Sequence, residues 1–179
     1  MRAQDLVFAL VLCLSGAAFA QGSANDSVEN CPMHKEHAAA DSHNAVVEKH
    51  GDQAMGFPHD ATTHHFVLSE DGGSIEVTTI DKNDKTNAEA IRSHLSHIAV
   101  LFNNGDFTTP MFVHDGIPPG VTTMKLLKSK IRYKYQELSS GGRVRIESAD
   151  PVAVAAVHDF LRFQISEHHT GDNPESNPD

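Results

Sequence analysis

Residues 64–69 contain the apolar run Phe66-Val67-Leu68, and residues 74–80 begin with alternating polar and apolar positions, which predicts two β-strands over these ranges. The string Asp71-Gly72-Gly73 between them predicts a hairpin turn. From residue 86 to residue 102 the apolar positions recur with helical period, and Thr86 and Glu89 have the spacing of a capping box. This part of the chain therefore predicts one ββα unit.

A second ββα unit follows along residues 131–168. Residues 131–138 and 143–148 alternate on either side of Ser140-Gly141-Gly142, and Asp150-Pro151 is typical of a helix N-cap followed by a first helical residue. The two units predict an α+β fold, an antiparallel four-stranded sheet with two helices on one face, in ββα-ββα order. The other face carries basic side chains, which we expect to be solvated and paired with Glu76 and Glu147. An acidic partner on that face is the alternative.

The remaining segments define the domain organisation. Residues 1–20 combine an apolar run that is too short to span a bilayer with Ala18-Phe19-Ala20, which predicts a cleaved signal peptide and a periplasmic or secreted protein. Residues 21–61 hold five histidines and few large apolar residues, which predicts a flexible His-rich arm. We expect a single α+β domain over 62–169 and a disordered tail over 170–179. Residues 103–123 resemble a long functional loop.

Charge and hydropathy exclude two classes of partner. The formal net charge is −10, whereas a nucleic-acid-binding protein needs a basic footprint. After the signal peptide no apolar stretch is long enough to cross a membrane. We therefore expect no nucleic-acid partner and no membrane span in the mature chain.

The first candidate chemistry lies in the arm, at Cys31-Pro32-Met33-His34. Loss of Cys13 with the signal peptide leaves Cys31 without an intramolecular disulfide partner. Thiolate, thioether and imidazole groups are the ligands that soft transition metals prefer, and the chain has thirteen histidines. We expect Cys31, Met33, His34 and His37 to capture a metal ion; an inert, solubilising arm is the alternative.

The second candidate site lies in the domain. His94 and His97 are three residues apart on the predicted helix, and His64 shares a strand face with Phe66. His114 stands beside Asp115 in the long loop, with Met111 nearby as a soft donor. We expect a metal site of His64, His94, His97 and His114. A hydrogen-bonded core histidine at His94 is the alternative.

The second predicted helix also ends in histidine. His168 continues its buried stripe, although it is equally suited to complement the helix macrodipole. His158 lies roughly 15 Å from His168 along a straight helix, so the two cannot share one ion.

Two resemblances add to these expectations. Cys31-Pro32-Met33-His34 resembles the core of the heavy-metal-binding modules of copper and silver efflux proteins. Residues 51–172 resemble an uncharacterised family of exported bacterial proteins through strings such as Thr62-Thr63-His64-His65-Phe66 and Pro118-Pro119-Gly120-Val121. The first resemblance implies copper chemistry, and the second implies export and one α+β domain.

Three functions remain open from the sequence. The first is a periplasmic transition-metal binding protein, for copper or alternatively zinc, in buffering, delivery or resistance, with a periplasmic protein as its exchange partner. The second is a metal-dependent, hydrolase-like enzyme, in which three histidines hold a catalytic zinc; the chain lacks the HExxH and GxSxG motifs. The third is an interaction module that needs no metal.

Overall fold

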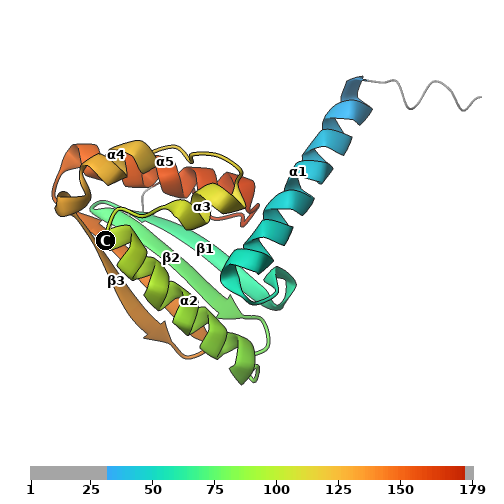
Figure 1. Ribbon diagram of the computed structural model, residues 1–179, viewed down its shortest axis with the longest axis horizontal. Helices are drawn as coiled ribbons and strands as arrows, with labels where there is room; N and C mark the ends of the chain where they lie inside the picture. The colour runs from blue at the N-terminus through green and yellow to red at the C-terminus, as the bar shows by residue number, and fades with distance from the viewer. Residues whose placement is uncertain (1–31, 176–179) are drawn as a thin grey trace, which may run out of the picture. The chain divides into compact units, whose positions relative to one another are not determined.

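The computed structural model describes residues 32–175, and the side chains from residue 42 onward. The chain divides into two compact units, Met1–His37 and Ala38–Asp179. The second unit contains the whole sheet and the helices that cover it (Figure 1). Among the described residues, no helix is both long and apolar enough to cross a membrane.

The sheet has four antiparallel strands: β1 (Thr62–Ser69), β2 (Gly72–Thr79), β3 (Ile131–Leu138) and β4 (Gly141–Ser148). Their spatial order is β1-β2-β4-β3, so the two hairpins meet at the central β2–β4 pair. The predicted α+β class and four-stranded antiparallel sheet are confirmed. The two predicted hairpins are therefore the two halves of one continuous sheet.

Both hairpin turns are tighter than predicted. The turn residues are Glu70-Asp71 and Ser139-Ser140, and the glycines that follow belong to β2 and β4. Gly73 is needed for packing instead of turning, because a Cβ there would lie 2.3 Å from the carbonyl oxygen of Val67 and 2.4 Å from Cδ1 of Leu161. The missing side chain lets a helix approach the sheet closely.

Two helices cover one face of this sheet. They are α2 (Lys85–Asn103), which packs on β3 and β4, and α5 (Pro151–Glu167), which packs on β1 and β2. Asp150 caps α5 as predicted, whereas Asp84, not the Thr86–Glu89 pair, caps α2 by accepting a hydrogen bond from Asn87 N. The core between the layers includes Phe66, Leu68, Ile91, Leu95, Val144, Ile146, Val157, Phe160 and Leu161.

The segment expected to be a long loop contains two short helices, α3 (Thr108–Val113) and α4 (Val121–Leu126). The apolar positions of these helices were too few to show a period. They are held instead by buried anchors, since Phe107, Val121 and Met124 have no exposed surface. The loop is thus part of the packed domain.

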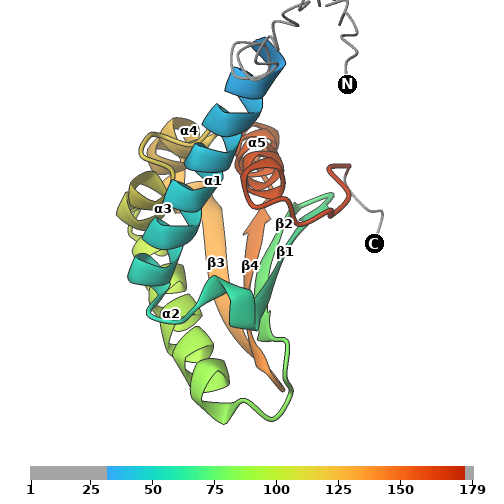
Figure 2. The same ribbon diagram turned by 90° about the vertical axis from the view of Figure 1, so that its right-hand side faces the viewer.

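The domain also begins earlier than expected. Helix α1 (Pro32–Met55) and the turn η1 (His59–Ala61) occupy most of the predicted flexible arm. Alanine-rich sequence favours helix without needing a strong apolar stripe. After residue 38 the helix is fixed by His43, whose Nε2 lies 2.7 Å from Oε2 of Glu167, and by His50, which stacks on Phe112. Figure 2 shows the ribbon of α1 leading into β1 by way of η1. Phe57, just after α1, belongs to the core.

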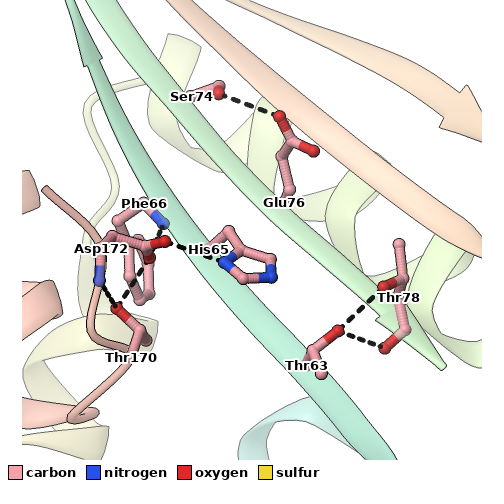
Figure 3. Close-up of polar contacts among 8 residues, drawn as sticks. All are labelled: Thr63, His65, Phe66, Ser74, Glu76, Thr78, Thr170 and Asp172. Atoms are coloured by element: carbon pink, nitrogen blue, oxygen red, sulfur yellow. Dashed lines mark hydrogen bonds and ion pairs between the residues drawn. The ribbon is translucent and has the colours of Figure 1, made fainter. Parts of the chain in front are cut away.

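The C-terminal segment is ordered as far as residue 175, where a disordered tail was expected. Asp172 accepts hydrogen bonds from the backbone N–H of Phe66 and from Nδ1 of His65, each at 2.8 Å, and from the hydroxyl of Thr170 (Figure 3). This carboxylate pairs with the Phe66 N–H at the outer edge of β1, a donor that would otherwise lack a partner within the sheet. Sequence could not show this contact, because it joins residues more than one hundred positions apart.

The open face of the sheet is a network of paired charges. Arg143 Nε lies 2.7 Å from Glu76, Lys134 Nζ lies 2.8 Å from Glu147, and Arg145 pairs with Asp71. These are the pairs expected for a solvated face. The basic side chains there are largely neutralised by their neighbours.

The outer edge of β3 is closed by one side chain, Asn103. Its amide donates to the carbonyl of Tyr133 at 2.8 Å and accepts from the Tyr133 N–H at 3.2 Å. We expect Asn103→Ala to lower the free energy of unfolding by about 1 kcal/mol, because both backbone groups lose their partner. Urea unfolding measures this. The neighbouring change Asn104→Ala should stay within about 0.5 kcal/mol, and an equal loss in both variants would contradict the edge role.

Candidate metal-binding site

A small cavity of about 90 Å³ lies between the sheet, α2, α3, α5 and the end of α1. Four imidazoles line it, together with apolar side chains from the core. The histidines are His64, His94, His114 and His168. They come from four different elements, so the complete fold is needed to bring them together.

Each histidine reaches the cavity for a local reason. His64 occupies the same face of β1 as Phe66 and Leu68, which alternation along the strand requires. His94 precedes the buried Leu95 of α2 and meets the ring of Phe57 edge-on at 5.8 Å. His114 and His168 are the C-cap residues of α3 and α5. The carbonyl end of a helix such as α5 favours a positive charge nearby.

His168 is the centre of this group. Its ring centroid lies 5.1 Å from that of His114 and 6.0 Å from that of His64. Two imidazoles on one tetrahedral ion, with metal–nitrogen distances of about 2.0–2.1 Å, have centroids roughly 5 Å apart. The His114–His168 spacing matches this value, and the His64–His168 spacing is longer.

Methionine contributes a further donor. Sδ of Met55, the last residue of α1, lies 3.3 Å from Nε2 of His64. Because a thioether sulfur can only accept, Nε2–H of His64 donates a hydrogen bond to it, and both side chains line the cavity. Thioether and imidazole are thus available side by side.

One nitrogen of His114 is left without a partner. Its Nε2 donates to Oε1 of Gln164 at 3.1 Å, so Nδ1 presents a lone pair. Nδ1 is buried and has no hydrogen-bond partner among the described residues; Oε2 of Glu167 is 3.7 Å away. His114 is 8% exposed and Gln164 is 4% exposed. A buried lone pair without a donor is costly, and a metal ion would satisfy it.

The cavity holds its histidines in the neutral form. Burial lowers the pKa of His64 and of His94 from 6.5 to about 4, with further lowering by the charge of His94 on His64 and of His97 on His94. Burial lowers the pKa of His168 to about 3, with repulsion from His114 as the next cause. The pKa of His114 is also lowered by burial, against the opposing effect of Gln164. Neutral imidazole is the form that binds metal.

An outer cavity of about 290 Å³ adjoins the inner one. Gly51, Met55, His64 and His168 line both cavities. The outer cavity differs in chemistry, since Glu48 and Glu167 line it together with His59, His65 and His169. The Met55–His64 pair therefore lines both an acidic, histidine-containing space and a largely apolar one.

The structure brings together three of the four histidines expected at the domain site: His64, His94 and His114. His97 is exposed and does not line the cavity, because its position on α2 points to the edge of the buried stripe. Met111 lines a different pocket, with Ile117 and Leu126. The predicted His94–His97 pair and the Met111 donor are therefore not part of this arrangement.

The arm ligands lie at the limit of the structure. Cys31 is outside the described residues. Met33, His34 and His37 belong to α1, but their side chains are also outside the described residues. Their capture role stays a prediction.

Sequence reasoning missed three residues of the cavity. His168 carried a usable signal, because it continues the buried stripe of α5. Met55 carried none, since it lies in a segment without strong apolar period, and Gln164 looked like an ordinary polar residue of α5. Their importance depends on tertiary contacts.

Across the part of the chain that the structure describes, no three His, Cys, Asp or Glu side chains already stand in the arrangement of a metal site. The imidazoles share a cavity, but their nitrogens do not yet converge on one point. Comparison with known protein families, with curated proteins and with solved structures finds no match to this chain.

Proposed function

We propose that this protein binds a transition-metal ion, copper first and zinc as the alternative, in the inner histidine cavity. The observation that carries the proposal is the grouping of His64, His94, His114 and His168 around one buried space. Histidine is only sometimes buried in proteins, so four imidazoles around one small internal space are more than packing alone explains. Imidazole suits copper and zinc alike.

Binding would require only side-chain movement. The His64 and His168 rings lie parallel, 6.0 Å apart at their centroids, and rotation about their side-chain bonds would turn nitrogens toward a common point. The lone pair of His114 Nδ1 is already free of hydrogen-bond donors among the described residues. Because the lowered pKa values keep the cluster unprotonated at neutral pH, few protons compete with the ion.

The expected export signal and the arm extend this proposal. A periplasmic location would expose the protein to copper outside the cytoplasm, and Cys31, Met33, His34 and His37 would offer soft ligands for initial capture. Buffering, delivery to a periplasmic partner or resistance would each follow from reversible binding. Membership of the exported family that residues 51–172 resemble stays part of the proposal.

The alternatives have less support. An interaction module would use the basic face of the sheet, but Arg143, Lys134 and Arg145 are each paired with a carboxylate. An enzyme would need an acid–base group beside the ion. Asp115, the expected partner of His114, is exposed, and Gln164 forms the hydrogen bond to His114 instead.

Metal stoichiometry of the full mature chain tests the proposal. The protein is titrated with Zn(II), Cu(II) and Cu(I) beside a variant that lacks the arm ligands, Cys31→Ser, Met33→Leu, His34→Ala and His37→Ala. We expect the variant to keep one tightly bound ion, because the cavity does not depend on the arm. Loss of all tight binding in the variant, or wild-type binding no tighter than that of an unstructured His-rich peptide, would contradict the proposal.

A further inference from the structure

We propose that Met55 is a ligand of the cavity ion together with His64, and that this pair makes the site prefer Cu(I) to divalent ions such as Zn(II). The inference rests on the proposed function, because it assigns the ion and one more ligand of the same cavity. It starts from the contact between Sδ of Met55 and Nε2 of His64, at 3.3 Å.

The backbone places Met55 firmly at this point. Helix α1 ends at Met55, and Gly56 follows in the left-handed conformation, with φ of 78° and its N–H bonded to the carbonyl of Asp52 at 2.9 Å. This is a common way to end a helix, and it sets the direction of the last side chains. Phe57 then enters the core, which anchors the segment on the other side. Met55 is thus held between two fixed neighbours.

The charge of the cavity favours a monovalent ion. No aspartate or glutamate is among the described residues that line the inner cavity. Imidazole and thioether ligands are neutral, so the bound ion would keep its full charge in largely apolar surroundings. The cost of burying a charge grows with its square, so Cu(I) would cost roughly a quarter as much as Zn(II) in the same space.

The donor atoms agree with the charge. A thioether is a soft ligand that selects Cu(I), whereas zinc sites in proteins use thiolate, imidazole and carboxylate donors. A zinc ion would use the cavity histidines without gaining from Met55, whereas Cu(I) would gain the thioether as well. The carboxylates nearby, Glu48 and Glu167, line the outer cavity and not the inner one, and Oε2 of Glu167 lies 3.7 Å from Nδ1 of His114.

The position of Met55 also suggests how the ion arrives. Met55, His64 and His168 line both cavities, so they form the boundary between the acidic outer space and the apolar inner one. An ion that enters through the outer cavity would meet this soft pair before His94, which lines the inner cavity alone. The preference for Cu(I) over Zn(II) would therefore be set at Met55 and His64, where the two cavities meet.

Met55→Leu tests the inference, because leucine conserves volume and apolar character but removes the sulfur. Affinities for Cu(I) and Zn(II) are measured by competition with chromophoric chelators, in the full mature chain that lacks the arm sulfurs through Cys31→Ser and Met33→Leu. Met111→Leu is the matched control, since Met111 lies in another pocket. We expect Met55→Leu to weaken Cu(I) binding at least about tenfold and to change Zn(II) binding less than about twofold.

Equal changes for both ions, or no change for either, would overturn the role of Met55 while leaving the histidine site intact. Absence of tight binding by the parent protein would instead overturn the proposed function. X-ray absorption of the Cu(I)-loaded parent gives an answer that does not depend on how the variant folds. A sulfur neighbour of copper supports the inference, and a shell of nitrogen alone contradicts it.

Discussion

Acidification from pH 7 to pH 4 should strongly destabilise the metal-free protein. The pKa values of His64 and His94 are lowered to about 4 and that of His168 to about 3, against 6.5 in the unfolded chain. Between these values the unfolded state binds more protons than the folded state, so stability is full above about pH 6.5 and falls as the pH falls. Each such histidine removes about 1.4 kcal/mol per pH unit in this window.

Urea unfolding at pH 7.5, 5.5 and 4.5 measures this effect. The carboxyls whose pKa values are lowered, such as those of Asp71 and Asp106, start from 3.8 and so titrate below this window. The titratable groups that face the cluster from the outer cavity are Glu48, Glu167, His59, His65 and His169. The two carboxylates partly offset the positive charge that the cavity histidines gain on protonation. A midpoint that does not move between pH 7.5 and 4.5 would contradict a neutral, buried cluster.

Replacing two inner histidines should remove most of the metal affinity. We expect His64→Ala with His94→Ala to weaken binding at the cavity at least about 100-fold, because two ligands are lost from a space with few other donors. Isothermal titration with Zn(II), or competition with a chelator for Cu(I), measures the loss. The same variant should also flatten the acid dependence, since two of the groups that cause it are gone.

The chain offers a closely matched control. His65 is the next residue of β1; it pairs with Asp172 and lines the outer cavity but not the inner one. His97 lies three residues from His94 on the exposed side of α2. The double variant His65→Ala with His97→Ala should keep metal affinity within about twofold. If both double variants lost affinity equally, binding would be a general property of the histidines instead of this cavity.

The parts of the fold that follow from local periodicity were predictable. Apolar runs and alternation located all four strands, and the two-residue period of a strand correctly assigned His64 to the core side of β1 with Phe66. Asp150-Pro151 marked the start of α5 because N-cap chemistry is local. In these cases the interactions that decide the structure lie within a few residues of one another.

The helical segment α1 and the ordered C-terminal residues were not predictable in the same way. Helix α1 is fixed by contacts of His43 and His50 with α5 and α3, and Asp172 is fixed by β1. These partners are separated by 62 to 124 positions along the chain. By composition these segments are polar, which is typical of disorder. They are ordered because of contacts with residues far away in the sequence.

The candidate site was predictable only in part, for the same reason. The helical spacing of His94 and His97 predicted that they bind one ion together. Two histidines on one helix turn can face different surroundings, however, and here His94 lines the cavity whereas His97 is exposed. His168 closes the group from another helix end, and Met55 adds sulfur from a segment expected to be flexible. Residue type indicated metal chemistry, while the choice among thirteen histidines required the fold.

The most direct test of a metal site in the inner cavity is NMR of the histidine rings during titration with one equivalent of a diamagnetic ion, Cu(I) or Zn(II). We expect the ring resonances of His64 and His168 to shift, together with those of His94 or His114, and the change to be complete at one ion per chain. The rings of His65 and His97 should stay where they are. Shifts confined to the exposed or arm histidines, with the cavity rings unchanged, would contradict a metal site in the cavity.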